Sequence, residues 1–142
     1  RSFDAIEAKD YLEALVSELA ATFGSASVRF ECRDTALLSL DAAVPFGLVA
    51  NELVTNALKY AHPDRTGEAV LVDLRAEGGE LVLCVDDHGP GLPPGLDPTT
   101  SQTMGFLLVN SLAAQLGGRL SFSGPPGLRA ELRFPREGRQ SQ

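Results

Sequence analysis

The sequence lacks most of the features that mark membrane, secreted or nucleic-acid-binding proteins. No apolar run approaches the ~20 residues that a membrane-spanning helix needs, and no basic segment followed by an apolar one opens the chain as a signal peptide would. Basic residues form no stripe, and 12 Lys and Arg stand against 19 Asp and Glu, for a net charge of −7. We therefore expect a cytoplasmic domain that contacts neither nucleic acid nor a membrane.

Cysteine is also scarce. The only two, Cys32 and Cys84, have a spacing that fits neither a metal site nor a redox pair. Both lie in strand-like runs, so we expect reduced thiols buried in the core. Unpaired thiols are consistent with a cytoplasmic compartment.

What is present is an ordinary globular composition, with 44% hydrophobic and 22% charged residues in 142. This length fits one domain. The chain begins abruptly at Arg1 within amphipathic sequence, as a domain of a longer protein would. We expect the domain to occupy residues 1–135 and the polar residues 136–142 to form a disordered tail.

Hydrophobic spacing predicts three helices and about six strands. The 3-and-4 spacing of helices marks residues 8–23, 44–63 and 105–116. Asp41 is the expected N-cap of the middle helix, and the expected apolar face of the last helix consists of Leu108, Leu112 and Leu116. Strand-like runs lie at 27–33, 37–40, 69–76, 80–86, 119–123 and 129–134. Together these elements predict an α/β two-layer sandwich, a mixed β-sheet with three helices packed on one face.

The middle helix carries a polar row beside its apolar stripe. Glu52, Asn56 and Lys59 follow one another at i, i+4 and i+7, so their side chains lie one above another. A neutral amide oxygen suits Mg²⁺, a carboxylate one turn earlier can orient or deprotonate a nucleophile, and an ammonium group can meet a phosphate. The row therefore predicts a wall facing a nucleotide triphosphate, although such rows are more often a solvated helix face.

Two glycine-containing segments fit the same ligand. Asp87 ends a strand and precedes Gly89 and Gly91, so a carboxylate that can accept from an exocyclic amine adjoins backbone that a flat ring can approach closely. Gly105 opens the last helix, whose first N–H groups can bind phosphate. The loop at 92–102, between these two segments, would close over the nucleotide as a lid. Each segment alone is typical of an ordinary turn, and only their order along the chain points to one pocket.

At these residues the sequence resembles a known family. NELVTNALKYAHP, VDDHGPGLP and TMGFLLVNSLAAQLGG are similar to the N, G1 and G2 boxes of the catalytic, ATP-binding domain of sensor histidine kinases. Those domains share the Bergerat fold with DNA gyrase, mismatch-repair and chaperone ATPases, and the resemblance is nearest to bacterial HWE-type kinases. It implies an enzyme of a two-component system that binds ATP and Mg²⁺. The enzyme would transfer the γ-phosphoryl group to a histidine on a separate dimerisation domain, with a response regulator downstream.

The resemblance implies a role for each matching residue. Asn56 would bind Mg²⁺, Glu52 would occupy the general-base position, and Asp87 would accept a hydrogen bond from the adenine amine. The remaining positions would meet the phosphates or shape the pocket: Lys59, His62, Gly89, Gly91, Thr103 and Gly105. For His62 a solvated helix cap is an equal alternative.

The sequence departs from the family pattern at a few positions. Thr103 stands where the G2 box usually has its first glycine, and Leu107 is apolar where a solvated residue is common, so it is expected to face a partner. Leu128 stands where the last strand usually starts with a threonine that supports the adenine-binding Asp. The missing hydroxyl is expected to weaken adenine binding. The two histidines, His62 and His88, lie inside the nucleotide motifs, so neither is expected to be the phosphoacceptor.

Two other functions stay open at this point. One is a degenerate nucleotide-binding or scaffold domain with little affinity for ATP, which the Leu128 departure favours. The other is an anti-sigma-factor serine kinase. The N box, with its Asn-Glu pair and Lys59-Tyr60, favours the histidine kinase.

Overall fold

The computed structural model describes residues 5–23, 27–34, 36–60, 69–87, 104–123 and 128–136. Along these residues the elements follow in the order β1 (Ala5–Glu7), α1 (Ala8–Phe23), β2 (Ser27–Cys32), β3 (Leu37–Ser39), α2 (Leu40–Tyr60), β4 (Ala69–Glu77), β5 (Glu80–Asp86), α3 (Met104–Gln115), β6 (Arg119–Ser123) and β7 (Arg129–Pro135). Of the expected tail, residues 137–142 lie outside the described part, and the Arg136 N–H donates to the Gly79 carbonyl at 2.8 Å.

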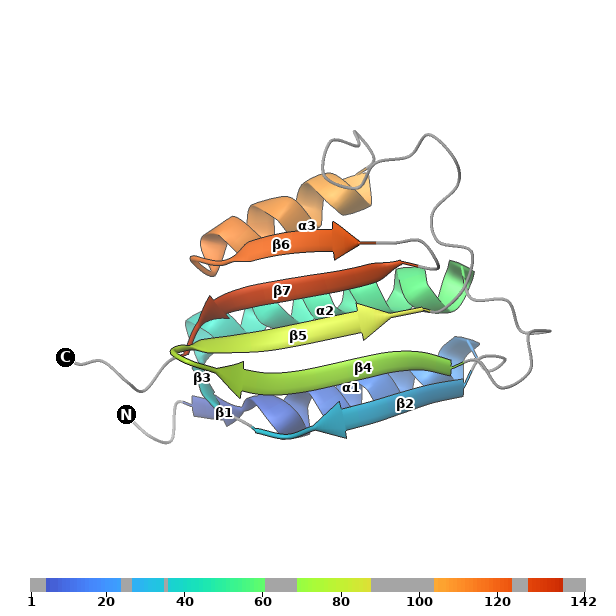
Figure 1. The fold of residues 1–142 in the computed structure, drawn as a ribbon, viewed down its shortest axis with the longest axis horizontal. Coiled ribbons are helices and arrows are strands. Elements are labelled where there is room, and N and C mark those ends of the chain that lie inside the picture. Colours follow the sequence, from blue (N-terminus) through green and yellow to red (C-terminus); the bar gives the residue numbers. More distant parts are fainter. Residues whose placement is uncertain are drawn as a thin grey trace.

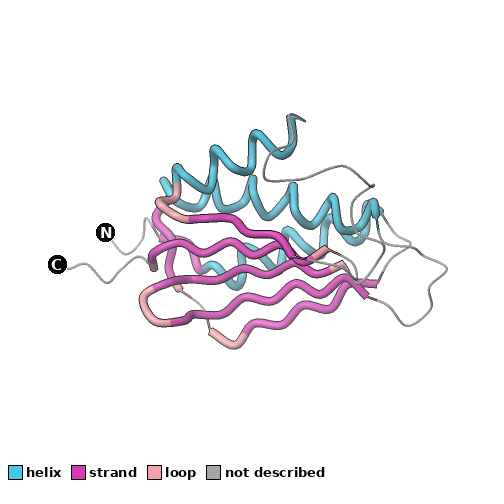
Figure 2. The backbone as a smooth tube through the Cα atoms, turned by 45° about the horizontal axis from the view of Figure 1, so that its top comes forward, coloured by secondary structure: helices cyan, strands magenta, loops and turns pink. Residues whose placement is uncertain are grey.

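The main sheet has five strands in the order β2-β4-β5-β7-β6. The β2–β4 pair is parallel and the other pairs are antiparallel, because the β2–β4 connection passes through α2 whereas β4 and β5 form a hairpin. All three helices lie on one face of this sheet (Figures 1 and 2). The predicted two-layer sandwich with a mixed sheet is therefore confirmed. Sequence spacing did not predict β1, which pairs with β3 in a separate two-stranded sheet.

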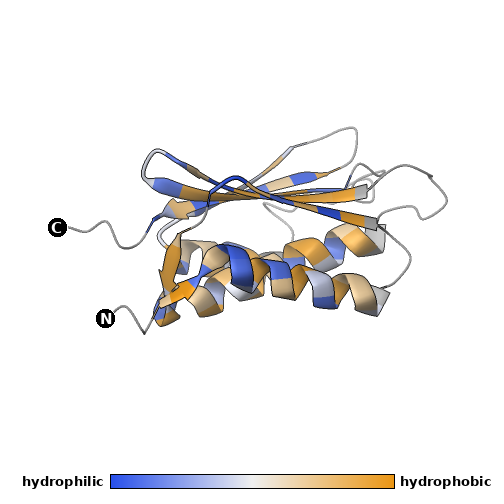
Figure 3. Cartoon of the chain, turned by 90° about the horizontal axis from the view of Figure 1, so that it is seen from below, coloured by the Kyte–Doolittle hydropathy of each residue, from blue (hydrophilic) through white to orange (hydrophobic). Residues whose placement is uncertain are grey.

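The core fills the space between the sheet and the helices, which Figure 3 shows edge on. Phe46 of α2 is fully buried, and its ring lies 6.3 Å from the ring of Tyr11 in α1 and 5.6 Å from that of Phe134 in β7. One side chain thus joins two helices to the sheet. Three further positions of the predicted apolar stripe on α2, Ala50, Leu53 and Ala57, are at most 7% exposed. The side chain at the last predicted position, Tyr60 or Ala61, lies outside the described part.

Two sequence-based predictions about the helices were wrong in detail. The α2 helix begins at Leu40, and Ser39 caps it, since its Oγ accepts a hydrogen bond from the Ala42 N–H at 3.2 Å. Asp41, the expected cap, lies in the first turn, where a carboxylate still favours the positive end of the helix dipole. In α3, Leu108 is 43% exposed, and the buried side is formed by Val109, Leu112 and Ala113.

None of the helices in the described part of the chain has both the length and the apolar character needed to cross a membrane.

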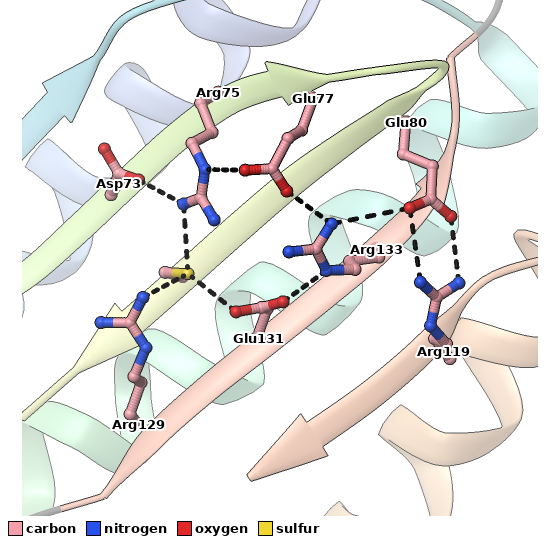
Figure 4. A network of polar contacts seen from close by, with 9 residues as sticks. Asp73, Arg75, Glu77, Glu80, Arg119, Arg129, Glu131 and Arg133 are labelled. Atoms are coloured by element: carbon pink, nitrogen blue, oxygen red, sulfur yellow. Dashed lines mark hydrogen bonds and ion pairs between the residues drawn. The ribbon is translucent and has the colours of Figure 1, made fainter. Parts of the chain in front are cut away.

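The face of the sheet opposite the helices carries rows of charged side chains that bond both along and across the strands (Figure 4). Arg75 bonds Asp73 at 2.9 Å and Glu77 at 3.4 Å, and Arg133 bonds Glu77 at 2.7 Å. Arg75 of β4 and Arg133 of β7 both pair in register with Val82 of β5. Val82 is fully buried although it points away from the core, because the aliphatic stems of arginines can cover an apolar neighbour.

Cys84 belongs to this outer face. It is free and only 2% exposed, as expected, but it alternates with the inward-facing Leu83 and Val85. Its Sγ lies 3.6 Å from Nη1 of Arg75 and 3.4 Å from Nη2 of Arg129. Burial raises the pKa of this thiol despite the two guanidinium groups. The prediction that Cys84 is a core residue was therefore wrong about the face. Cys32 packs against the core, but it is only partly buried and not fully buried as predicted.

Two glycines join the end of α3 to the sheet. The Gly117 N–H donates to the Ala114 carbonyl and the Gly118 N–H to the Ala113 carbonyl, both at 2.9 Å, and Gly117 has a φ of 73°. These bonds form a Schellman motif. A Cβ on Gly118 would lie 2.2 Å from the Arg133 carbonyl oxygen, so only glycine lets the chain pass β7 this closely.

We predict that Gly118→Ala lowers the free energy of unfolding by about 1–3 kcal/mol, because backbone and core must shift to admit the methyl group. Gly79→Ala is the matched control, since a Cβ there meets nothing within 4 Å, and it should change stability by no more than about 0.5 kcal/mol. Urea unfolding of both variants tests this. Equal stabilities would show that the close approach at Gly118 is not a constraint.

Low pH should weaken the ion pairs between charged side chains on the outer face of the sheet. Hydrogen bonds from Arg133 and Arg75 lower the pKa of the Glu77 carboxyl below its usual 4.5. Partial burial opposes ionisation of Glu131, but its contacts with Arg133 outweigh burial and lower its pKa too. A carboxyl group whose pKa is lower in the folded state than in the unfolded state stabilises the fold at pH values above its unfolded-state pKa. This stabilisation is lost as the pH falls through the folded-state pKa.

We therefore predict that the free energy of unfolding falls as the pH drops below about 4.5, and that Glu131→Gln makes this fall shallower. Solvent screens these pairs and keeps the contribution of each one small, so the difference is best seen in denaturant titrations from pH 7 to pH 3. Glu13→Gln, the same charge change on the exposed side of α1, serves as control. A Glu131→Gln profile that matches this control would contradict the prediction.

Candidate functional site

The predicted site residues that the structure describes gather at one end of the molecule. The C-terminal half of α2, the end of β5, the start of β7 and the start of α3 all lie at the right of Figure 1, and Figure 2 shows the same grouping. The topology produces this grouping because β4, which follows α2 in the chain, begins at this end. β5 runs antiparallel to β4 and so ends here, and β7, antiparallel to β5, begins here. Asp87, which follows β5, and Asn56, in α2, therefore belong to the same end of the sandwich.

Glu52 and Asn56 form the centre of the polar row on α2. Nδ2 of Asn56 donates to Oε2 of Glu52 at 3.3 Å, across one helical turn. A carboxylate only accepts hydrogen bonds, so the amide nitrogen must face Glu52 and the carbonyl oxygen must face away. Both residues are partly exposed. The pair thus presents a neutral oxygen whose direction is set by its neighbour.

Next to this pair lies a second polar contact on the same helix. The Thr55 hydroxyl donates to Oδ1 of Asn51 at 3.3 Å. Asn51 is exposed and its carbonyl oxygen is occupied by this bond, whereas the Asn56 amide meets Glu52 through its nitrogen. The two asparagines of the motif thus differ: the Asn51 amide accepts a hydrogen bond through its oxygen, whereas the Asn56 amide donates one through its nitrogen. That Asn56 binds the metal stays a prediction.

Asp87 lies directly after β5, and Leu128 directly before β7. Oδ1 of Asp87 accepts a hydrogen bond from the Leu128 N–H at 2.9 Å, and the Asp87 N–H donates to the Leu128 carbonyl at 3.1 Å. Asp87 is only 2% exposed. A carboxylate buried to this degree needs such partners, and its fixed orientation suits an acceptor for one specific donor on a ligand.

The described residues include only part of the predicted site. Lys59 lies in the last turn of α2 and Gly105 in the first turn of α3, where N–H groups without helical partners favour an anion. Leu107, two residues on, is 47% exposed, and its role at a partner surface stays a prediction. Four predicted positions lie outside the described residues: His62, Gly89, Gly91 and Thr103. The expected lid at 92–102 lies outside them as well.

Among the described residues at this site, the main-chain N–H of Leu128 is a group that the sequence did not predict. The family pattern has a threonine hydroxyl at this position, and the leucine found there predicted weakened support for Asp87. The structure supplies a donor from the backbone instead. No residue type signals such a donor, because every residue except proline carries one.

The described groups fit a nucleotide with its metal. The Asn56 carbonyl oxygen is of the kind that Mg²⁺ accepts when phosphate oxygens and waters complete its shell. The Asp87 carboxylate accepts a hydrogen bond and donates none when ionised, which matches the amine of adenine and not the carbonyl of other purines. The start of α3 adds partial positive charge at the same end of the fold.

Comparison with known proteins points to the same family that the sequence motifs resemble. Residues 42–138 match the family described as "Histidine kinase-, DNA gyrase B-, and HSP90-like ATPase". The chain is 29% identical over 113 residues to the blue-light-activated histidine kinase 2 of Erythrobacter litoralis, a match that covers 78% of this chain and 33% of that protein. It is 35% identical over 104 residues to the sensor histidine kinase PdtaS of Mycolicibacterium smegmatis, covering 70% and 21% respectively.

Among solved structures, the fold resembles the histidine kinase domain of a blue-light-activated histidine kinase from Erythrobacter litoralis. The TM-score is 0.76 at 28% identity, over 90% of this chain and 60% of that one. The chain spans a third or less of the length of the two curated relatives. All three proteins are histidine kinases, so neither a scaffold domain nor an anti-sigma serine kinase is favoured. The chain belongs to the histidine kinase-, DNA gyrase B- and HSP90-like ATPase family.

Proposed function

We propose that this domain binds Mg-ATP and delivers the γ-phosphoryl group to a histidine on a separate dimerisation domain, as the catalytic domain of a two-component sensor histidine kinase. In this proposal the domain works in the cytoplasm, where ATP is supplied, and a response regulator receives the phosphoryl group in turn. The named relatives are sensor or light-activated histidine kinases, which supports the reaction type.

The observation that carries the proposal is the orientation of the Asn56 side chain. Because Glu52 holds the amide nitrogen, the carbonyl oxygen is presented for a hard cation before any ligand arrives. Such preorganisation lowers the cost of binding, since the side chain need not be ordered again. A solvated helix face, the alternative for this row, requires no such fixed pair.

The other residues complete the proposed site by their chemistry. Asp87 accepts the adenine amine, and Lys59 and the start of α3 meet the phosphates. When bound, Mg²⁺ neutralises charge on the phosphate oxygens, which is the main requirement of phosphoryl transfer. Glu52 has two roles in this proposal: it holds Asn56, and it occupies the general-base position next to the reacting phosphate.

We predict that the 142-residue chain binds ATP in the presence of Mg²⁺ and that Asn56→Ala removes the Mg²⁺-dependent part of the affinity, leaving the value measured in EDTA. Isothermal titration calorimetry with and without Mg²⁺ measures both quantities. Asn51→Ala is the matched control, because it deletes the same side chain from the neighbouring polar contact. It should retain the full response to Mg²⁺.

Two outcomes would count against this assignment. A folded wild-type chain that gives no binding heat at millimolar ATP would overturn the nucleotide-binding function itself. An Asn56→Ala variant that still responds to Mg²⁺ as the wild type does would leave ATP binding intact and place the metal ligand elsewhere.

Substitutions of Glu52 separate its two roles. Glu52→Ala releases the Asn56 amide and should weaken Mg-ATP binding by about tenfold, the scale of one hydrogen bond to a charged group. Glu52→Gln keeps an acceptor oxygen for that amide but cannot take a proton, so its affinity should stay within about threefold of wild type. Calorimetry at fixed Mg²⁺ measures this difference, with circular dichroism as the check on folding. Equal affinities in the Ala and Gln variants would show that Glu52 does not hold Asn56.

A further inference from the structure

We infer that Leu128 is a positioning residue for base recognition, and that it acts through its main-chain N–H by holding the Asp87 carboxylate in the direction of the adenine amine. This inference rests on the proposed function and deepens it, because it names what fixes the base specificity of the site. The Leu128 side chain has no part in it.

Leu128 holds both the main chain and the side chain of Asp87. One bond, from Asp87 N–H to the Leu128 carbonyl at 3.1 Å, extends the β5–β7 ladder beyond the Asp86–Arg129 pair. The other, from Leu128 N–H to Oδ1 of Asp87 at 2.9 Å, fixes the carboxylate. A carboxylate has roughly four acceptor positions, so one N–H orients the group and leaves capacity for a ligand amine.

The donor is rigid because the strand that carries it is anchored on the far face of the sheet. Arg129, the next residue, lies 3.8 Å from the Asp86 carboxylate. Its guanidinium group also lies 3.4 Å from the Cys84 sulfur, a contact that Figure 4 shows. These contacts come from two positions on β5, so they hold the start of β7 along its length. A threonine hydroxyl can rotate away from its acceptor, whereas a backbone N–H in a ladder cannot.

This arrangement explains how the site can do without the family's threonine. Any residue except proline supplies the same N–H, so leucine at this position is compatible with full adenine recognition. The Leu128 departure then no longer favours a degenerate domain, contrary to the expectation drawn from the sequence. Deleting the Leu128 N–H should weaken the recognition of adenine, whereas changing the Leu128 side chain should leave it unchanged.

The test compares ATP with inosine triphosphate, which carries a carbonyl in place of the exocyclic amine. Calorimetry with Mg²⁺ gives the ratio of the two dissociation constants for the 142-residue chain and its variants. The wild type should prefer ATP. Leu128→Pro, which removes the N–H but keeps the carbonyl, should reduce that preference about tenfold, whereas Leu128→Ala and Leu128→Thr should keep it within about twofold.

A second variant removes the same donor with less disturbance of the chain. Replacing leucine 128 by its α-hydroxy acid turns the amide into an ester, which deletes the N–H and keeps the side chain and the carbonyl. If Leu128→Pro fails to fold, as judged by circular dichroism, this ester decides the question. It should lower the preference for ATP as the proline variant is expected to do.

The outcomes distinguish this inference from the function it rests on. An ester variant that prefers ATP over inosine triphosphate as strongly as the wild type overturns the role of Leu128 while the domain remains an ATP-binding one. A Leu128→Thr variant that gains tenfold or more in ATP preference also overturns it, because the missing hydroxyl would then matter. A folded wild-type chain that binds neither nucleotide overturns the proposed function, and the inference with it.

Discussion

The packing of Phe46 is the contact on which the site depends. Its ring is fully buried between Tyr11 of α1 and Phe134 of β7, so it fixes α2 against the neighbouring helix and the sheet at once. A helix held this way cannot rotate about its axis without exposing its whole apolar stripe to water. Such exposure costs about 25 cal/mol of free energy per Å² of apolar surface. Its polar row is therefore held in one direction. Glu52 and Asn56 are placed by the core beneath them as much as by their own hydrogen bond.

Sequence spacing predicted the helices and the long strands because each carries several turns or alternations of pattern. The α1 helix was predicted over its full observed range, Ala8–Phe23. The β1 strand was not predicted, since its three residues carry no usable alternation, whereas β3 lies within the predicted run at 37–40. The α2 N-cap was placed two residues late because serine and aspartate both cap helices, and only the hydrogen bond from Ala42 decides between them.

Errors about individual side chains have a common physical cause. Cys84 was assigned to the core because a buried thiol is usually a core residue, yet here long arginine side chains bury an outward-facing position of β5. Leu108 was assigned to the buried face of α3 because leucine is apolar, but Val109 and Ala113 occupy that side. In both cases burial was decided by what a neighbouring element places over the residue. The sequence of the element itself does not contain that information.

The two ends of the candidate site differed in how far they could be predicted. On α2, side-chain identity and helical spacing suffice, and the predicted neighbours Glu52 and Asn56 do touch. At Asp87 the decisive group is a backbone N–H, whose position depends on the register between β5 and β7. A slip of one residue would turn Phe134 outward and Arg133 into the core, so burial and charge pairing select the same register. That register brings the Leu128 N–H to the Asp87 carboxylate, and the ion pairs on the outer face thus support a site on the other side of the sheet.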